Sequence, residues 1–312
     1  MKLLVTGARG LLGSEFVAIG AGRGLVVVGL GREELDVTDA DAVSETIARE
    51  APDWVVHCAA YTAVDRAEEE PELAMQVNRD GAGNVAGAAA DAGSGVVYIS
   101  SDYVFDGAGE RPYSLSDPVG PLSVYGRSKL AGEEAVLSGG ADRTGSGDVG
   151  RESSGVRSAP VLVVRTGWLY GAGGRSFVQA ILDRAEAGGA LRVVEDQRGR
   201  PTWARNVAGA VLELIESGAT GVWHVADGGD TTWLEFAREA LHVRGLSVPV
   251  EGLSTAAWGA AAPRPKYSVL DVSGTEVRLG RRMMPWREAL QRFLEEGRSE
   301  ERSGDDHEGE SG

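Results

Sequence analysis

The chain has 312 residues, with 47 acidic against 31 basic side chains and a formal net charge of −16. This charge argues against nucleic acid and anionic membranes as main partners, because phosphate binding needs a basic footprint. A single cysteine, Cys58, excludes an internal disulfide and a four-thiolate zinc site. No apolar run approaches the ~18 residues of a membrane span, and no export signal precedes the first strand-like run, so a cytoplasmic protein is expected.

The first half of the sequence alternates short apolar runs with helical patterns. Strands are predicted at 3–6, 25–28, 54–57, 96–99 and 161–164, and helices from residue 11, at 39–50 and at 72–92. The strands are near-continuous runs of Val, Leu and Ile, which is typical of strands buried on both faces. The fold class is therefore predicted as α/β, a Rossmann-like doubly wound parallel sheet with a smaller C-terminal substrate-binding lobe.

The second half shows shorter, mixed elements. Helices are predicted at 176–187, 204–216 and 286–296, and a strand at 222–225. We expect residues 1–165 to form the Rossmann domain, later segments near 203–225 to add to it, and residues 166–296 to form the substrate-binding lobe. Two stretches lack core-forming residues: 138–160 is expected to be a mobile surface insertion, and 297–312 a disordered acidic tail.

A glycine-rich turn lies between the first strand and the first helix. Gly7, Gly10 and Gly13 stand where glycine allows a tight turn, a close approach to a pyrophosphate and close packing of helix against strand. The helix N-terminus there supplies unpaired N–H groups and a partial positive charge. A glycine-rich turn can be only a turn, but its place in a βαβ pattern predicts a dinucleotide site.

The second strand carries the signal for cofactor choice. An NAD enzyme usually places a carboxylate about 20 residues after the glycines, where it bonds the ribose 2′-OH. Here the segment at 29–32 contains no carboxylate, whereas Arg32, and Arg9 in the turn, are placed to pair with a 2′-phosphate. Solvated arginines are the alternative. The sequence favours NADPH and leaves NADH open.

Two further signals concern proton transfer. Tyr125 and Lys129 stand four residues apart on a predicted helix, and an ammonium near the phenol should lower the tyrosine pKa toward working pH. Ser101 follows the fourth strand, where a hydroxyl can hydrogen-bond a substrate carbonyl. A solvated helix face and a Ser-Asp turn are the alternatives. The order of glycine turn, serine and Tyr-x-x-x-Lys at successive βα positions favours a carbonyl reductase.

Seven stretches carry a family resemblance: 35–39, 59–68, 101–107, 124–133, 165–170, 196–202 and 264–271. With them the chain resembles the extended short-chain dehydrogenase/reductase family and, within it, the dTDP-4-dehydrorhamnose reductases. The last two stretches distinguish these reductases from general sugar-nucleotide epimerases. The resemblance implies reduction of the C4 keto group of dTDP-4-dehydro-L-rhamnose with NAD(P)H, in dTDP-rhamnose biosynthesis.

The resemblance also assigns residues. Tyr125 would be the catalytic acid, Lys129 would hold the cofactor ribose, and Ser101 would bind the keto oxygen. The cofactor would be bound by Gly7, Gly10, Leu11, Leu12, Gly13, Arg32, Asp36, Val37, Ala59, Ala60, Tyr61, Tyr125 and Lys129. The dTDP-sugar would be bound by Ser101, Asp102, Trp168 and Arg200. Arg198, Arg200, Arg264 and Lys266 are further expected to offer a basic patch to the pyrophosphate.

Some questions stay open at this stage. No resident metal is assigned, although some relatives bridge a dimer with Mg²⁺; Glu15 and the pair at 195–196 would serve here. A homodimer is left open. Cys58 is expected to be a structural thiol. Two other functions compete with the reductase: an enzyme acting on another nucleotide sugar, and a non-catalytic regulatory subunit such as that of methionine adenosyltransferase.

Overall fold

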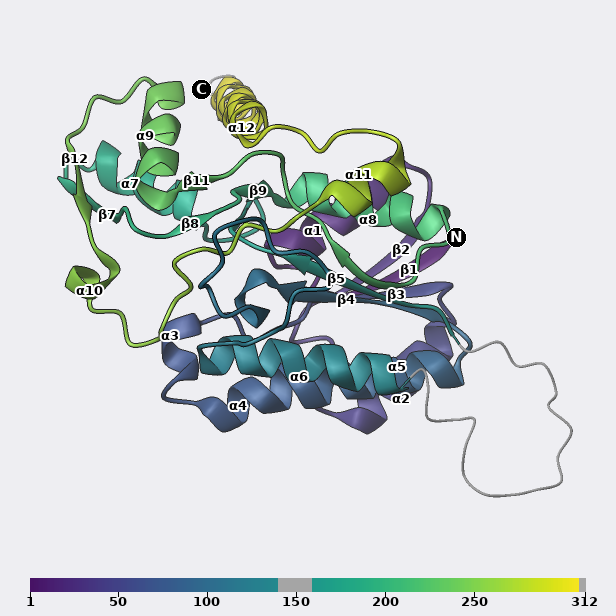
Figure 1. Ribbon diagram of the computed structural model, residues 1–312. Coiled ribbons are helices and arrows are strands. Elements are labelled where there is room, and N and C mark those ends of the chain that lie inside the picture. Colours follow the sequence, from purple (N-terminus) through teal and green to yellow (C-terminus); the bar gives the residue numbers. More distant parts are fainter. Residues whose placement is uncertain (140–158, 309–312) are drawn as a thin grey trace, which may run out of the picture.

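The computed structural model describes residues 1–139 and 159–308 (Figure 1). The expected insertion at 138–160 therefore lies almost wholly outside the described residues. The strands are β1 (Lys2–Thr6), β2 (Val26–Leu30), β3 (Trp54–His57), β4 (Gly95–Ser101), β5 (Val161–Thr166), β6 (Leu169–Tyr170), β7 (Leu191–Val194), β8 (Arg198–Gly199), β9 (Thr202–Trp203), β10 (Gly221–His224), β11 (Thr231–Thr232) and β12 (Val250–Leu253). The helices are α1 (Leu11–Gly22), α2 (Ala40–Glu50), α3 (Val64–Ala67), α4 (Pro71–Met75), α5 (Gly81–Asp91), α6 (Val124–Gly139), α7 (Phe177–Glu186), α8 (Ala204–Glu216), α9 (Trp233–Arg244), α10 (Thr255–Trp258), α11 (Ser273–Leu279) and α12 (Trp286–Glu308), with a π-helical turn η1 (Gln76–Asp80) and a 3₁₀ turn η2 (Asp102–Val104).

The main sheet is parallel and has the strand order β10-β5-β4-β3-β1-β2. The chain starts in β1, builds outward to β2, and then returns to the other side of β1 with β3. In such a sheet a crevice opens at the carboxyl ends of the strands where the order reverses, between β1 and β3. The predicted doubly wound fold is confirmed, and the glycine-rich turn lies at that crevice.

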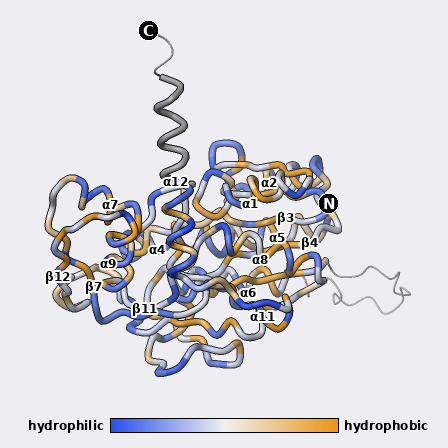
Figure 2. Tube along the Cα trace, turned by 90° about the horizontal axis from the view of Figure 1, so that it is seen from above, coloured by the Kyte–Doolittle hydropathy of each residue, from blue (hydrophilic) through white to orange (hydrophobic). Residues whose placement is uncertain are grey.

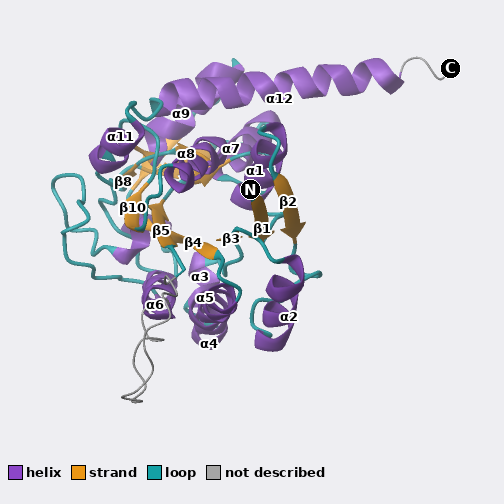
Figure 3. Cartoon of the chain, turned by 90° about the vertical axis from the view of Figure 1, so that its right-hand side faces the viewer, coloured by secondary structure: helices purple, strands orange, loops and turns teal. Residues whose placement is uncertain are grey.

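Both faces of the sheet are buried, which explains the continuous apolar runs. Leu3 and Val5 pack in one core with α1 and α8, whereas Leu4 packs in a second core with α2 and α5. Figures 1 and 3 show α1 and α8 on one side of the sheet and α2, α5 and α6 on the other. Side chains of neighbouring residues in a strand alternate between these two layers, so neither face can be polar.

The smaller lobe has its own core. The parallel pair β7 and β12 packs with α7, α9 and the start of α12 around Phe236, Leu241 and Trp286. The lobe is not the continuous segment 166–296, because α8 and β10 belong to the Rossmann sheet: β10 pairs with β5, and α8 buries Val207 and Val211 in the same core as Val5. The expectation that segments near 203–225 join the first domain agrees with this pairing.

The last helix is longer than expected. It was predicted to end at Glu296 and to be followed by a disordered tail, but α12 runs to Glu308 (Figure 3), and residues 309–312 lie outside the described residues. The disordered tail stays a prediction for 297–308, a stretch whose lack of apolar residues excludes core packing while its Glu and Arg residues favour helix elongation. Figure 2 shows the first part of α12 lying against the body of the protein.

No helix among the described residues combines the length and the apolar composition that crossing a membrane would require.

Candidate active site

The glycine-rich turn is packed so closely that two of its positions have no room for a side chain. Gly7 has a φ of +64°, and a Cβ at this position would lie 2.6 Å from the backbone nitrogen of Ala59. A Cβ on Gly13 would lie 2.2 Å from the carbonyl oxygen of Gly7. Glycine is therefore required at both positions, and the turn brings the ends of β1 and β3 together.

The first helix opens toward this crevice with free backbone donors. Its N-cap, Gly10, has no side chain to bond the first N–H groups, and the first turn contains no acidic residue. Leu11 and Leu12 begin the helix there. Unpaired N–H groups and the positive end of the helix dipole form a site for a pyrophosphate. The residues present thus fit a dinucleotide at the place predicted for it.

A second glycine loop, which the sequence reasoning missed, lies against the same helix. Residues 171–174 follow β6, and a Cβ on Gly173 would come within 2.0 Å of the Ser14 hydroxyl. A Cβ on Gly174 would lie 3.6 Å from Leu11 Cγ, which is an ordinary van der Waals contact. Three glycines in four residues after a strand were the available signal. This loop brings the smaller lobe to the helix N-terminus.

The catalytic candidates meet at the end of β4. Ser101 is buried; its hydroxyl donates to Asp102 Oδ1 at 3.0 Å and accepts from the Tyr103 N–H at 3.2 Å. Tyr125 stands in the first turn of α6. Burial raises the pKa of the Tyr125 phenol to about 12, hydrogen bonding with Ser101 opposes this rise, and the Asp102 charge adds to it. Serine and tyrosine are therefore brought together as predicted.

Lys129 also faces the site, but its electrostatic effect differs from the prediction. The Lys129 Nζ lies 4.2 Å from the centroid of the Tyr98 ring, and burial lowers the pKa of this ammonium to about 7. The expected lowering of the Tyr125 pKa by Lys129 is wrong, because loss of hydration dominates at the phenol. Tyr125 consequently keeps its proton at neutral pH.

Tyr98 is a buried support that the sequence reasoning missed. Its hydroxyl donates to the carbonyl oxygens of Asn78 at 3.2 Å and of Lys129 at 3.3 Å. A Cβ on Gly132 would lie 2.1 Å from this hydroxyl, so the glycine makes room for it. Asn78, in the π-helical turn η1, donates to the Ser128 hydroxyl at 2.8 Å. These contacts fix the position of α6 around Lys129.

A buried ion pair holds the same helix against the sheet. Glu133, one turn after Lys129, accepts two hydrogen bonds from Arg165 of β5, at 2.9 and 2.7 Å, and a third from the Ser100 hydroxyl. The side chains of Arg165 and Glu133 are 8% and 3% exposed. Removing one partner of such a pair leaves an uncompensated buried charge, so this pair anchors the catalytic helix.

Asp102 and Trp168 lie where the resemblance places substrate contacts. Burial raises the pKa of Asp102 to about 6, and hydrogen bonds from Ser268 and Ser101 oppose the rise. Trp168 has a positive φ of +51°, which is unusual for a bulky residue, and its ring stacks on Trp233 with centroids 3.5 Å apart. Gly199 has no Cβ to obstruct the indole. Trp233, which the sequence reasoning missed, fixes this ring.

The expected basic patch is largely engaged with carboxylates. Arg198 pairs with Asp230, and Arg264 forms a two-pronged bond with Asp65 at 2.7 and 2.8 Å. Lys266 is exposed. In Arg200, Nη1 donates to the Asp227 carbonyl oxygen at 3.1 Å, while the buried Nε has no partner among the described residues. Arg200 is thus the member of the patch with a buried donor that no other described group satisfies.

The remaining cofactor candidates surround the crevice. Ala59, Ala60 and Tyr61 follow β3, and the Tyr61 N–H donates to the Asn78 side chain at 2.8 Å. Arg32 and Asp36 are exposed after β2, and Val37 is buried. A hydrogen bond from the Thr38 N–H lowers the pKa of the Asp36 carboxyl.

Cys58 and the metal candidates have structural surroundings. Burial raises the pKa of the Cys58 thiol to about 12, which agrees with a structural thiol. Glu15 is buried and pairs with Arg205 at 3.1 Å, and Glu195 and Asp196 are exposed. Within residues 1–139 and 159–308 no group of three or more His, Cys, Asp or Glu side chains is placed to hold a metal.

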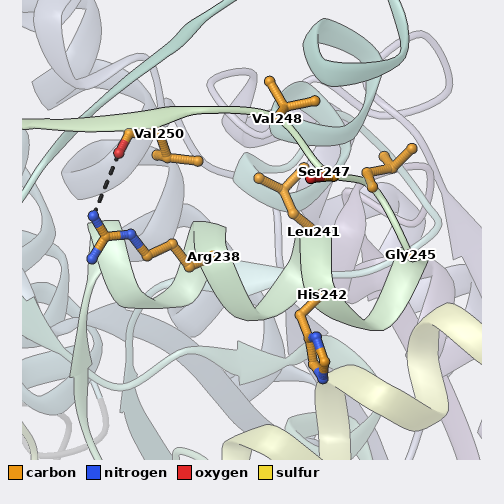
Figure 4. Close-up of a pocket in the computed structure, with 8 residues that line it drawn as sticks. Arg238, Leu241, His242, Gly245, Ser247, Val248 and Val250 are labelled. Atoms are coloured by element: carbon orange, nitrogen blue, oxygen red, sulfur yellow. Dashed lines mark hydrogen bonds between the residues drawn. The ribbon is translucent and has the colours of Figure 1, made fainter.

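A surface cavity of about 410 Å³ lies apart from these residues, at the end of α9 (Figure 4). Leu241, Val248 and Val250 line it, and Arg238 donates to the Val250 carbonyl oxygen at 3.4 Å. None of the catalytic candidates contributes to it; they gather at the carboxyl ends of the strands of the main sheet.

Comparison with known proteins gives consistent matches along the chain. A family model described as RmlD substrate binding domain matches residues 1–299. A dTDP-4-dehydrorhamnose reductase of Streptomyces griseus is 40% identical over 295 residues, which are 93% of this chain and 91% of that protein. A dTDP-4-keto-6-deoxy-D-glucose reductase of Streptomyces niveus is 36% identical over 86% of this chain and 88% of that protein.

A solved structure resembles the whole fold. The crystal structure of a dTDP-4-dehydrorhamnose reductase from Bacillus anthracis in complex with NADP has a TM-score of 0.86 and 33% sequence identity. The similarity covers 95% of this chain and 99% of that one.

Proposed function

The chain belongs to the RmlD substrate binding domain family, and from that membership we propose that it reduces the C4 keto group of dTDP-4-dehydro-L-rhamnose to give dTDP-L-rhamnose. The observation that carries the proposal is the meeting of Ser101 and Tyr125 at the end of β4, next to Lys129 and the glycine cradle. The cofactor is NAD(P)H, with NADPH favoured by the relative that is bound to NADP.

The dinucleotide would be held by the glycine cradle and by Lys129. Gly7 and Gly13 leave room for the backbone to approach the pyrophosphate, and Lys129 is proposed to bind the nicotinamide ribose. When bound, the reduced nicotinamide supplies a hydride to the keto carbon. The protein's part is to orient the ketone and to provide a proton.

Ser101 and Tyr125 supply that proton and stabilise charge. Both hydroxyls hydrogen-bond the keto oxygen, on which negative charge grows during the reaction, and Tyr125 passes its phenolic proton to this oxygen. The burial that raises the Tyr125 pKa to about 12 keeps the phenol protonated at neutral pH. The Ser101 proton, which is donated to Asp102 in the free protein, turns to the keto oxygen when the substrate binds.

The nucleotide sugar would lie between the sheet and the smaller lobe. Asp102 and the Trp168 ring are proposed to contact the sugar, and Arg200 the pyrophosphate. The support for Arg200 is its buried Nε, which no other described group satisfies. Charge reversal at Arg200 should raise the substrate KM; an unchanged KM would remove Arg200 from the site.

The activity is tested by mixing the purified protein with NADPH and dTDP-4-dehydro-L-rhamnose. The proposal expects oxidation of NADPH and formation of dTDP-L-rhamnose, identified by mass spectrometry and sugar analysis. NADPH oxidation that is absent with this substrate, while the protein is folded and binds the cofactor, contradicts the assignment.

A second substrate has a specific observation in its favour. The Streptomyces niveus relative, at 36% identity, reduces the 4-keto group of a different dTDP-linked 6-deoxyhexose, as its name states. The same serine, tyrosine and lysine serve either sugar, because the reacting group is identical. Parallel kcat/KM values with dTDP-4-dehydro-L-rhamnose and dTDP-4-keto-6-deoxy-D-glucose decide between the two.

A regulatory subunit is less well supported, because a binding module has no use for the complete Ser101, Tyr125 and Lys129 set. A stoichiometric synthetase partner in a pull-down, without reductase activity, would reverse this ranking. We also propose a cytoplasmic location, which the sparse use of cysteine supports.

A further inference from the structure

The loop after β2 meets the glycine-rich turn at the place where the adenosine ribose of a dinucleotide lies in this kind of fold. Arg9 belongs to the turn, and Gly31 is the first residue after β2. The backbone then bends, since the N–H groups of Glu34 and Leu35 both donate to the Gly31 carbonyl oxygen, at 3.1 and 3.0 Å. This bend returns the Glu34 side chain to the end of the strand.

The Glu34 carboxylate has two donors there. Its Oε2 accepts from the Gly31 N–H at 2.6 Å, and its Oε1 accepts from Arg9 Nη2 at 2.6 Å. The Gly31 hydrogen bond, followed by the Arg9 hydrogen bond, lowers the pKa of the Glu34 carboxyl, so this group stays ionised at neutral pH. A Cβ on Gly31 would lie 3.0 Å from Arg9 Cδ and 3.1 Å from Glu34 Oε2, so the three residues are closely packed.

A guanidinium and a backbone N–H that converge on one point form an anion site. In this protein the anion is a carboxylate of the chain itself. A 2′-phosphate needs the same two donors, whereas a free ribose 2′-OH donates a hydrogen bond to a carboxylate. The carboxylate missing from the segment 29–32 is therefore supplied by Glu34, four residues after the last residue of β2.

We propose that Glu34 sets the cofactor choice of this enzyme by competing with the 2′-phosphate of NADPH for Arg9 and the Gly31 N–H. The inference rests on the proposed function only in requiring a dinucleotide. NADPH displaces Glu34 from its donors, and NADH binds with the carboxylate in place. The protein thus binds both NADPH and NADH. Because Glu34 competes for Arg9, the preference for NADPH over NADH is smaller than it would be if Arg9 had no carboxylate partner.

Two nucleotides that differ only in the phosphate test this directly. Isothermal titration of the full chain with adenosine 2′,5′-bisphosphate and with 5′-AMP measures the preference without any reaction. Glu34→Gln should tighten bisphosphate binding about 10-fold, because competition from one charge-assisted hydrogen bond is removed, and should leave 5′-AMP binding equal or weaker.

The neighbouring Glu33 provides a matched control. Its carboxylate lies 4.0 Å from Arg9 and makes no bond to Gly31, so Glu33→Gln removes the same charge without freeing the donors. It should change the preference by less than about 3-fold. Arg9→Gln should weaken bisphosphate binding and spare 5′-AMP binding. The ratio of kcat/KM for NADPH to that for NADH should move in the same directions.

The outcomes separate the two proposals. Equal effects of Glu34→Gln and Glu33→Gln, or an unchanged preference in Glu34→Gln, overturn the role of Glu34 and leave the reductase assignment intact. A folded protein that binds neither nucleotide overturns both. A preference that shifts only in Glu34→Gln and Arg9→Gln supports the inference.

Discussion

The two ends of the cofactor crevice are built on different principles. At the nicotinamide end the charges are buried: Lys129 lies on Tyr98, and Glu133 pairs with Arg165 inside the protein. At the adenosine end Arg9 and Glu34 form an exposed pair, with side chains 67% and 41% exposed. Buried charges are costly to leave unpaired, whereas exposed pairs exchange partners at little cost. The side chains around the catalytic candidates are therefore held in fixed positions, whereas the side chains proposed to select the cofactor can exchange partners.

The largest difference between the two ends of the crevice is expected in how much a substitution lowers the free energy of unfolding. Arg165→Ala leaves Glu133 as a buried carboxylate without its cation and should lower the free energy of unfolding by about 3–5 kcal/mol. Denaturant unfolding followed by circular dichroism measures this loss. Arg111→Ala is the control, because Arg111 is exposed and pairs with Asp117 near the surface, and its loss should be much smaller than that of Arg165→Ala. Similar losses in both variants would remove the distinction between the two kinds of pair.

The next effect concerns turnover. Tyr125→Phe removes the proton donor and should lower kcat by about 10²-fold or more, with NADPH binding kept. Tyr113→Phe is a matched control, because it also removes a buried phenol, one bonded to Asp106 outside the site. Normal turnover in Tyr125→Phe would exclude Tyr125 as the acid.

A smaller effect concerns pH. The pKa of Lys129 is lowered to about 7, so this ammonium is charged below that pH and loses its charge as pH rises through it. The value of kcat/KM for the cofactor, which reports the free enzyme, should fall above about pH 7. NADH should show the same fall, although it lacks the titrating 2′-phosphate.

Tyr98→Leu sharpens this prediction. The aromatic ring stabilises the ammonium by about 0.5–2 kcal/mol, so its loss should move the fall in kcat/KM to lower pH, and Tyr98→Phe should restore most of the shift. The other groups that face Lys129 are Glu133 on its own helix and His57 and Cys58 at the end of β3. Burial lowers the pKa of His57 to about 3, so His57 is neutral here. A fall at an unchanged pH in Tyr98→Leu would contradict the role of the ring.

The smallest effect is expected at the adenosine end. Glu34→Gln should change the free energy of unfolding far less than Arg165→Ala does, because both partners of the Arg9–Glu34 pair are exposed. Thermal unfolding of this variant beside Arg165→Ala measures the contrast on one scale. A loss as large as that of Arg165→Ala would mean that the adenosine end is structural.

The local sequence pattern predicted the strands of the main sheet and the helical spacing of two catalytic candidates. The apolar runs located β1, β3, β4 and β5, and the four-residue spacing placed Tyr125 and Lys129 on one helix face. It did not predict contacts between residues that are far apart in the sequence. Nothing local relates Arg165 to Glu133, 32 residues earlier in the chain, or β10 to β5.

Two features of the site could not be predicted from the sequence for the same physical reason. The Tyr125 pKa was expected to fall because a lysine is near, but burial, which the spacing does not reveal, dominates. The segment 29–32 contains no carboxylate, as stated from the sequence, but the bend at Gly31 returns the Glu34 side chain to the strand end, and Glu34 was not singled out. In both cases the surroundings of a side chain, which the local sequence does not reveal, decide its behaviour.

The central claim is that chemistry and cofactor choice reside at opposite ends of one crevice. It is tested most directly by measuring kcat of the wild type and of Tyr125→Phe with saturating NADPH and with saturating NADH. The account predicts the same loss, about 10²-fold or more, with both cofactors, because the phenol acts only at the nicotinamide end. A loss that depends on the 2′-phosphate, or no loss with either cofactor, would contradict it.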